Sequence, residues 1–360
     1  MRQADVKKIA FINPMRSRAP TGIGIAADEI WKLLPREFRT ESTVLHRWFA
    51  AVNDGSMTRA ARGILRVALV QVSPFFFPRR CHLLFATHHA PFWRTGRHAL
   101  VVYDTIPLRF PEQAPAQTRY FRRWLPRALH CAERVVTISA SVREELRSRN
   151  FPRASEAIVL PSRSAALEPR RGASIVQRRA ARELLVVGAR YSHKNIDVVL
   201  GALEQINARE GAPVRLIIAG CRRDLWAKTN GGLDRFERTG WVRVIDRIDA
   251  DGLSALYGRA TALIYPSLAE GQGLPPLEAM ARGCPVICSD LPVLRETCGE
   301  AASYFPPTNV TELCSMLDGL LSGRLDEKLN RQHAHARERL VYFGEDALRS
   351  RWAAFLEGWG

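Results

Sequence analysis

The stretch EGQGLPPLEAMARGCPVICSD, residues 270–290, is the part of the chain that decides its fold. It places Glu270 and Glu278 eight residues apart, on either side of a Gly-Gln-Gly turn and a Pro-Pro pair. Gly271 and Gly273 allow a tight turn and a close approach of the backbone to a ligand, and proline presets the first turn of a helix. Free N–H groups and the dipole at such a helix start favour an anion such as a diphosphate. The alternative is that the two carboxylates only cap and solvate a surface turn.

On both sides of this stretch, short apolar runs of strand length alternate with amphipathic runs of helix length. In the second half the predicted strands are Glu183–Val187, Val214–Ala219, Thr261–Tyr265 and Pro285–Cys288, and the predicted helices are Asn195–Ile206, Leu253–Arg259, Pro276–Arg282 and Val310–Leu321. In the first half the strands are Lys8–Asn13, Leu83–Ala86, Ala99–Tyr103, Arg134–Ile138 and Ala157–Leu160, and the helices are Ile25–Leu34 and Ser139–Arg147. Strands that alternate with helices predict parallel sheets with crossover helices.

The two halves are separated by residues 161–182, which are rich in Ser, Ala and Arg and have no periodicity. A chain of 360 residues has the length of two domains. We therefore predict the α/β class, with two Rossmann-like doubly wound domains facing each other across a cleft. The predicted bounds are 1–165 for the N-terminal domain, 166–182 for a linker and 183–340 for the C-terminal domain. Ligands of such sheets bind at the carboxyl ends of the strands.

The formal net charge of +17 is concentrated in the first half of the chain. Residues 1–180 hold 31 Lys and Arg against 13 Asp and Glu, a net charge of +18, whereas residues 181–360 hold 22 against 23, a net charge of −1. This asymmetry indicates a polyanion or an anionic membrane surface as a partner. A coding bias towards arginine is the alternative explanation, since only six of the 53 basic residues are lysine.

The seven cysteines are odd in number and contain no C-x-x-C pair, which is typical of reduced thiols in the cytoplasm. Asp5, Lys7 and Lys8 precede a short apolar run that does not have the pattern of a signal peptide. The apolar run Val67–Pro78 falls short of the about 20 residues that a membrane-spanning helix needs. We therefore expect a cytoplasmic protein without a transmembrane segment.

The stretch 270–290 resembles the E-x7-E signature of the retaining nucleotide-sugar glycosyltransferases with the GT-B fold, specifically family 4. Further matches to that family's motifs extend from about residue 9 to 306, so that the resemblance covers most of the chain. These matches are Thr21–Ala27, Val102–Pro107 with Pro111, Val136–Leu146, Val187–Ile196, Leu256–Ser267 and Gly299–Pro306. The resemblance implies a GT-B fold in which the last helix, residues 341–360, crosses back to the N-terminal domain.

The resemblance also implies roles for individual residues. Glu270 would contact the hydroxyls of the donor sugar, Glu278 would hold the ribose of the nucleotide, and Lys194 would neutralise the diphosphate with the help of Arg190. Fixed cations and N–H donors stabilise the charge that grows on a leaving nucleoside diphosphate, so neither a metal nor a cofactor is expected. The remaining site residues are Tyr103 and Asp104 as catalytic groups, and Gly22, Gly24, Gly271, Gln272, Gly273 and Leu274 as lining of the donor phosphates and sugar.

The chain departs from the family's pattern at three of these positions. Tyr103 stands where the family commonly has a histidine that faces the sugar, so either its phenol substitutes or another group serves, such as His88 or His89. The family's phosphate-binding arginine usually follows the glycine directly, and here Arg190 stands one position further on. Gln272 occupies a position that is often phenylalanine. The triplet Asp-Ala-Asp at 249–251 fits a helix start better than a metal site.

Two segments suggest an anionic inner-membrane surface as a partner. In residues 59–80, Arg59, Arg62 and Arg66 are predicted on one face of a helix, with apolar residues opposite and a Phe-Phe-Phe triplet after it. In residues 119–127, arginines alternate with aromatic residues, as at membrane interfaces or single-stranded nucleic-acid sites. An ordinary surface helix with a solvated arginine face is the alternative for the first segment.

The closest resemblance is to bacterial mannosyltransferases of polysaccharide assembly. It implies transfer of a hexose, first of all mannose from GDP-mannose, to a glycan or a lipid-linked saccharide, with retention of configuration. Such an enzyme would be cytoplasmic, or peripheral on the inner face of the cytoplasmic membrane. A UDP-sugar-dependent transferase of the same fold is one alternative. Another is a basic GT-B scaffold that binds nucleic acid or a membrane without catalysis, although the sequence contains no nucleic-acid-binding motif.

Overall fold

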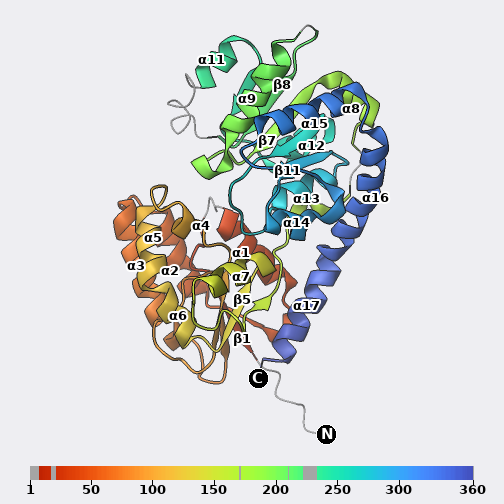
Figure 1. The fold of residues 1–360 in the computed structure, drawn as a ribbon. Coiled ribbons are helices and arrows are strands. Elements are labelled where there is room, and N and C mark those ends of the chain that lie inside the picture. The colour runs from red at the N-terminus through yellow and green to blue at the C-terminus, as the bar shows by residue number, and fades with distance from the viewer. Residues whose placement is uncertain (1–7, 18–21, 170–171, 210, 222–232, 360) are drawn as a thin grey trace. The chain divides into compact units, whose positions relative to one another are not determined.

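A computed structural model describes residues 8–17, 22–169, 172–209, 211–221 and 233–359 of the chain. The chain forms two compact units: unit 1 contains Met1–Ser164 and Phe343–Gly360, and unit 2 contains Ala165–Tyr342. Each unit has a six-stranded sheet whose strand pairs are all parallel, with helices packed on it (Figure 1). The predicted α/β class with two Rossmann-like sheets is confirmed.

In unit 2 the strand order is β12-β11-β10-β7-β8-β9. The strands are β7 (Glu183–Val187), β8 (Arg215–Ala219), β9 (Val242–Ile245), β10 (Ala262–Tyr265), β11 (Val286–Ser289) and β12 (Ser303–Phe305). The helices are α8 (Ile175–Ala181), α9 (Ile196–Asn207), α11 (Leu233–Arg238), α12 (Ala250–Arg259), α13 (Leu274–Met280), α14 (Pro292–Cys298), α15 (Val310–Ser322) and α16 (Asp326–Tyr342). The chain moves outward from β7 through β9 and then restarts beside β7 with β10. The β7–β10 boundary is therefore the switch point at which ligands of doubly wound sheets bind.

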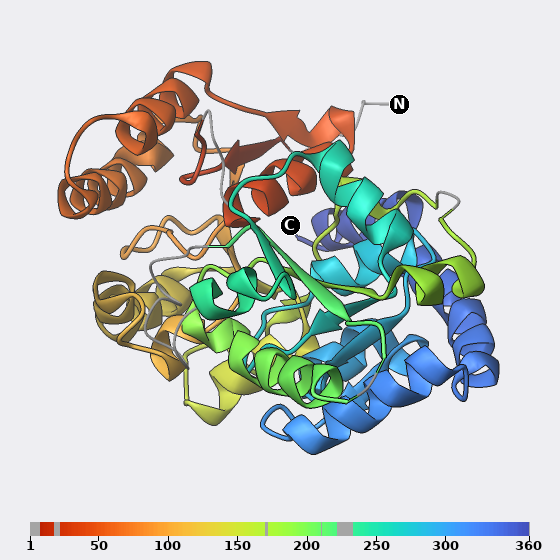
Figure 2. The ribbon, with the colours of Figure 1, turned by 90° about the horizontal axis from the view of Figure 1, so that it is seen from above.

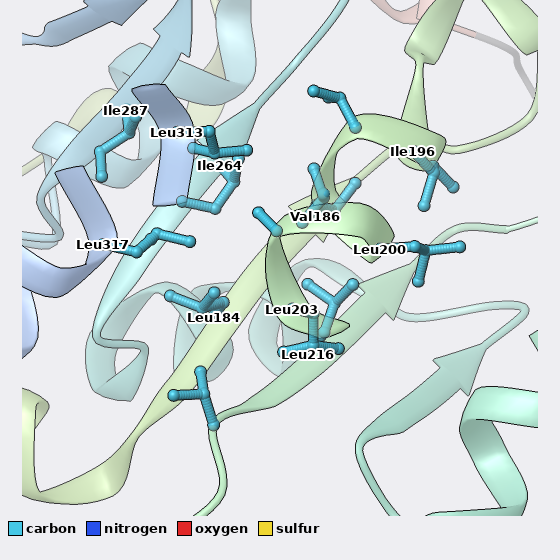
Figure 3. Packing of buried hydrophobic residues seen from close by; sticks show 14 of the residues in the cluster. Leu184, Val186, Ile196, Leu200, Leu203, Leu216, Ile264, Ile287, Leu313 and Leu317 are labelled. Carbon is cyan, nitrogen blue, oxygen red and sulfur yellow. The ribbon is translucent and has the colours of Figure 1, made fainter. Parts of the chain in front are cut away.

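The core of unit 2 lies between its sheet and the helices α9 and α15. Leu184 and Val186 of β7 face Leu200 and Leu203 of α9, and the side chains of α15 cover the neighbouring part of the sheet (Figure 3). Because helices cover the strands, the strands carry nearly continuous apolar runs, which made them recognisable in the sequence.

In unit 1 the strand order is β2-β1-β3-β4-β5-β6, with its switch point between β1 and β3. The strands are β1 (Ile9–Ile12), β2 (Arg39–Thr40), β3 (His82–Phe85), β4 (His98–Val102), β5 (Arg134–Thr137) and β6 (Ile158–Val159). The helices are α1 (Gly22–Leu33), α2 (Thr43–Asp54), α3 (Arg59–Val72), α4 (Ile106–Arg109), α5 (Pro115–Arg123), α6 (Leu125–Cys131), α7 (Ala140–Ser148) and α17 (Glu345–Glu357). The 3-10 turns of the chain are η1 (Arg36–Phe38), η2 (Ser73–Phe76), η3 (Ala165–Leu167), η4 (Ser192–Lys194) and η5 (Gly299–Ala301).

The helix α17 near the end of the chain belongs to unit 1. Trp352 and Phe355 are buried in the same cluster as Phe11 of β1 and Ile30 of α1. Trp359 is fully buried, and its Nε1 donates a hydrogen bond to Glu133 Oε2 at 3.0 Å. Unit 1 is therefore built from two pieces of chain that are separated by the whole of unit 2.

The segment 166–182, for which we predicted a linker, contains a helix and is part of unit 2. A capping box of Ser174 and Gln177 begins α8. Arg178, only 1% exposed, donates to the main-chain oxygens of Ala173, Tyr257, Ala260 and Arg282 at distances of 2.6–2.9 Å. The segment lacks an apolar period because a buried guanidinium, together with the single apolar side chain of Ile175, attaches its helix to the unit.

Helix α3 exposes the face opposite to the one that the surface-helix alternative predicts. Arg62 Nη1 and Arg66 Nε donate to the main-chain oxygen and to Oδ1 of Asn53 in α2, at 2.9 and 3.0 Å. The side chain of Arg59 lies outside the described part of the structure. The exposed positions of α3 are Ala60, Ile64, Leu65, Ala68 and Val72. The solvated arginine face is therefore wrong, because periodicity defines two faces of a helix but not which one meets the protein.

The aromatic residues of 119–127 are also not available to a membrane. Phe121 is fully buried and Tyr120 is 9% exposed. Trp124 stacks on Phe92 with ring centroids 4.6 Å apart, and Arg123 and Arg127 lie over its ring. In residues 119–127, the predicted membrane contact would therefore depend on exposed arginines and not on aromatic rings.

We expect Arg178→Met to lower the free energy of unfolding by roughly 3 kcal/mol, because it removes hydrogen bonds from a buried charged donor to several carbonyls. Arg215→Met is the matched control, since Arg215 is 58% exposed and lies 3.6 Å from Glu183. Its cost should stay below about 0.5 kcal/mol. Urea unfolding followed by circular dichroism measures both, and equal effects would contradict the structural role of Arg178.

Candidate functional site

The most distinctive polar group of unit 2 is an ion pair at the carboxyl edge of its sheet. Lys194 Nζ lies 2.5 Å from Glu270 Oε1, and the two side chains are only 16% and 10% exposed. Lys194 ends the turn η4 that follows β7, and Glu270 lies in the loop that follows β10. Because β7 and β10 are neighbours, residues 76 positions apart meet at the switch point of the sheet.

The two loops that carry this pair are joined by main-chain groups and by one amide. Asn195 Nδ2 donates to the main-chain oxygens of Pro266 and Pro307 at 3.0 and 2.7 Å. The main-chain N–H of Leu268 donates to the oxygen of His193 at 2.7 Å. Lys194 is therefore fixed against the loop of Glu270.

The environment of Glu270 keeps its carboxyl ionised. Burial raises the pKa of Glu270, but the charge and the hydrogen bond of Lys194 oppose this effect, so that the net pKa lies below its usual value. Tyr265 at the end of β10 has its Oη 3.4 Å from Lys194 Nζ, and the ammonium lies 5.3 Å from the ring centroid. Burial and the charge of Glu270 raise the pKa of Tyr265 well above its usual value, so its phenol stays neutral.

Glu278, the second carboxylate of the signature, is part of α13 and accepts a hydrogen bond from Tyr257 Oη at 3.1 Å. Gly273 precedes α13 with a φ of 97°, and a Cβ there would lie 2.7 Å from Leu294 Cδ2. Only glycine therefore fits this turn. Gly271 and Gln272 are buried beside it, and Leu274 begins the helix.

Arg190 is not part of the buried group around Lys194. It follows Gly188, which has a φ of 79°, and its main-chain N–H donates to the Gly188 oxygen at 2.7 Å. Its side chain is exposed. The role in phosphate binding that the resemblance implies for Arg190 stays a prediction.

The candidate residues of unit 1 lie at the carboxyl edge of that unit's sheet. Tyr103 directly follows β4, is 4% exposed, and has a pKa raised by burial and by the charge of Asp28. Asp104 is half-buried and its Oδ1 accepts from the main-chain N–H of Ile106 at 3.0 Å. The catalytic roles predicted for both stay predictions.

Gly22 and Gly24 lie in the first turn of α1, not in a loop. We expected a glycine loop before a helix beginning at Ile25, but the helix begins at Gly22 itself. Thr21, the first residue of that motif, lies outside the described residues. Because glycine has no side chain, the first turn of α1 carries no side-chain bulk at these two positions.

His88 of unit 1 is 2% exposed and His89 is half-buried, and burial lowers the pKa of both, so both are uncharged at neutral pH. Burial and the charge of Arg66 lower the pKa of His88 to about 3. The His88 ring lies 4.7 Å from the Phe121 ring, and the His89 ring lies 4.8 Å from that of Tyr120. Their surroundings are therefore those of neutral aromatic side chains in a core.

Asp249 is the N-cap of α12, as expected, since its Oδ1 accepts from the main-chain N–H of Gly252 at 2.8 Å. Among the residues that the structure describes, no cluster of His, Cys, Asp and Glu side chains has the arrangement of a metal site. Within the same residues, no helix is long and apolar enough to cross a membrane.

Sequence reasoning missed three residues of the unit 2 site. Tyr265 and Tyr257 lie in segments quoted for the resemblance, but only burial next to Lys194 and Glu278 reveals what their hydroxyls contact. Asn195 follows Lys194 directly in a recognised Lys-Asn pair, which was the available signal for its importance. The contacts of its side chain depend on loops 71 and 112 residues away.

Comparison with known proteins finds a family match within unit 2. Residues 181–323 match the family described as Glycosyl transferases group 1. The O-antigen chain mannosyltransferase RfbU of Salmonella typhimurium is 30% identical over 226 residues, which are 62% of this chain and 61% of that protein. The O-antigen chain mannosyltransferase B of Escherichia coli is 30% identical over 231 residues, 60% of this chain and 59% of that protein. The chain thus spans about 60% of the length of these curated relatives.

Solved structures show the fold of the whole chain. Anabaena HepE in complex with UDP-glucose has a TM-score of 0.72 at 18% identity, with coverage of 98% of this chain and 99% of that one. Sucrose-phosphate synthase from Thermosynechococcus elongatus has a TM-score of 0.71 at 18% identity, with coverage of 98% of both chains. The fold is GT-B, as the resemblance implied.

We expect Lys194→Met to lower the free energy of unfolding by roughly 3 kcal/mol at about pH 7, because the buried Glu270 carboxylate loses its cation. In the intact protein the pKa of Glu270 is lowered, so the pair stabilises the fold above the usual carboxyl pKa and this stability is lost as the pH falls through the lowered pKa. In the variant, burial should raise the pKa of Glu270. The deficit should therefore shrink towards about pH 4, as urea unfolding at both pH values would measure.

The double variant Lys194→Met/Glu270→Gln is the control for this experiment. It buries no unpaired charge and should recover much of the lost stability at neutral pH. A deficit of Lys194→Met that is the same at both pH values, or that the second substitution does not relieve, would contradict the ion-pair interpretation.

Proposed function

Because residues 181–323 match the glycosyltransferase group 1 family within a GT-B fold, we propose that the protein is a retaining hexosyltransferase. It transfers a sugar from a nucleotide-sugar donor to a hydroxyl of a glycan or a lipid-linked saccharide. The observation that carries the proposal is the Lys194–Glu270 pair at the β7–β10 switch point. Doubly wound sheets bind their ligands at such a point.

The chemistry of the pair suits a sugar diphosphate. The ammonium of Lys194 has three donors, of which the structure directs one at Glu270 and one at Tyr265. The third is available for a phosphate oxygen, where a fixed positive charge stabilises the leaving diphosphate. The carboxylate of Glu270 has further lone pairs that accept hydrogen bonds from sugar hydroxyls.

In the proposed reaction the bond between the anomeric carbon and the diphosphate breaks, and the acceptor oxygen bonds to that carbon. The acceptor proton leaves with the nucleoside diphosphate, whose departing oxygen helps to remove it. Lys194 supplies the positive charge at the diphosphate, so that the reaction is proposed to need no metal. Glu278 would hold the ribose, with its carboxylate oriented by Tyr257.

The relatives suggest the donor. RfbU and mannosyltransferase B are mannosyltransferases of O-antigen chains, which favours mannose from GDP-mannose as the transferred sugar. HepE was solved with UDP-glucose, which supports a UDP-sugar as the second candidate. A lipid-linked acceptor would place the enzyme on the inner face of the cytoplasmic membrane.

We expect GDP to raise the thermal transition of the protein more than UDP or ADP at equal concentration, because a ligand that binds only the folded state stabilises it. Differential scanning fluorimetry measures the shift, and EDTA should leave it unchanged. A larger shift with UDP would favour the UDP-sugar alternative. No shift with any nucleotide would favour the scaffold without catalysis.

We expect Glu270→Gln to lower the rate of sugar transfer by roughly 10²–10³-fold, because an amide accepts hydrogen bonds from sugar hydroxyls more weakly than a carboxylate does. The GDP-induced thermal shift should remain. Glu327→Gln is the matched control on the same unit, since the Glu327 side chain is 86% exposed and pairs with Arg331 at 2.8 Å. Radiolabelled transfer from GDP-mannose measures both. Full activity of Glu270→Gln would refute the assigned role.

A further inference from the structure

Helix α3 of unit 1 is an amphipathic surface helix that exposes its apolar face and turns its described arginines towards α2. Among the side chains of α3 that the structure describes, from residue 60 onward, the exposed ones are all apolar and follow helical spacing: Ala60, Ile64, Leu65, Ala68 and Val72. Ile64 alone is 71% exposed. Surface helices usually turn such a stripe to the core and their charges to water, so an exposed apolar face marks an interaction site.

The apolar face continues into exposed aromatic rings beside the end of α3. Phe75 in the turn η2 is 78% exposed and stacks on Trp93 with ring centroids 5.6 Å apart. Phe76 meets Trp48 of α2 edge to face at 5.3 Å. The turn η2 thus joins the two ring pairs, and the helices α2 and α3, which pack against each other, lie at the periphery of unit 1 (Figure 2, orange). We name these four rings and the exposed residues of α3 the α3 face.

The backbone under the rings is held firmly. Arg97 donates to the main-chain oxygens of Pro74, Phe77, Pro78 and Cys81, the residues on either side of the aromatic turn. Trp93 Nε1 donates to the main-chain oxygen of Gln71 at 3.2 Å. The rings are therefore exposed on a fixed turn, not on a frayed end.

The charge around the α3 face has one sign. Residues 55–103 contain seven arginines and neither Asp nor Glu. Exposed arginines adjoin the ring residues in sequence: Arg47 precedes Trp48, Arg79 and Arg80 follow the phenylalanines, and Arg94 follows Trp93. Two acidic residues lie at the ends of α2: Glu41, two residues before it, contacts His46 at 3.0 Å, and Asp54, its last residue, accepts from Ser17 Oγ at 2.5 Å.

The aliphatic stripe, the exposed rings and the arginines together favour one of three candidate partners: a second copy of the chain, single-stranded nucleic acid or a lipid bilayer. A second copy of the chain in a twofold contact would oppose the same arginine-rich surfaces without acidic partners, which is unfavourable. Single-stranded nucleic acid would use arginines and rings, but it offers nothing to the aliphatic stripe of Ile64, Leu65 and Val72. A bilayer with anionic headgroups accommodates all three features: aliphatic side chains, interfacial rings and arginines.

We infer that the α3 face binds the surface of a membrane that contains anionic lipids. Phe75, Phe76, Trp48 and Trp93 enter the interfacial region, α3 lies along it, and the flanking arginines contact lipid phosphates. The inference goes beyond the proposed function, because binding to vesicles is measured without donor or acceptor. Failure of the one can therefore be distinguished from failure of the other.

Sedimentation of the full chain with phosphatidylcholine vesicles, with and without phosphatidylglycerol, tests the inference. Binding should require phosphatidylglycerol and weaken with salt. Phe75→Ser should weaken it by roughly tenfold, and Arg79→Ala/Arg80→Ala by roughly fivefold per arginine. Val176→Ser is the matched control, because Val176 is 71% exposed on α8 of unit 2. It should bind as the parent does, and the GDP-induced thermal shift of every variant should be unchanged.

Three outcomes would overturn the inference. One is binding that is independent of phosphatidylglycerol or unaffected by Phe75→Ser. Another is a stable dimer, seen by light scattering, which Ile64→Lys converts to a monomer, because the face would then join two copies. The third is that a short single-stranded DNA binds the protein in physiological salt and displaces it from the vesicles.

Discussion

Asn195 is the side chain on which the carboxyl edge of the unit 2 sheet depends. Its amide connects the loops after β7, β10 and β12 through the oxygens of Pro266 and Pro307. It does so with a φ of 53°, in the left-handed region that asparagine tolerates better than most residues. Lys194 directly precedes it and Glu270 lies in the loop it fixes. The geometry of the ion pair therefore depends on one amide and one unusual backbone conformation, together with the main-chain hydrogen bond from Leu268 to His193.

Much of the fold could be predicted because it follows from local patterns in the sequence. The strands and helices of both sheets follow apolar runs, and two predicted helix starts are confirmed at positions where a single side chain caps the helix. Ser139 Oγ accepts from the N–H of Val142 at 3.1 Å, and Asp249 caps α12. The missed strands are β2, β9 and β12. All three are short and lie at the edges of their sheets, where a continuous apolar run is not required.

The rest could not be predicted because it depends on which surfaces meet. Arg178 gives α8 no apolar period, and the orientation of α3 depends on Asn53, which binds both of its described arginines. In the candidate site, motif resemblance identified Lys194 and Glu270 separately. Their pairing needed the parallel register of β7 and β10. The roles of Tyr103 and Asp104 are not decided by their burial and stay predictions.

The division of unit 1 into two pieces of chain has a consequence for synthesis on the ribosome. Its amino-terminal piece emerges first, but Trp352, Phe355 and Trp359, which complete the cluster around Phe11, emerge only after all of unit 2. During elongation the first sheet therefore leaves part of its apolar face uncovered, and unit 2 can finish folding earlier than the domain that precedes it. Such an exposed intermediate is the kind of surface that chaperones recognise.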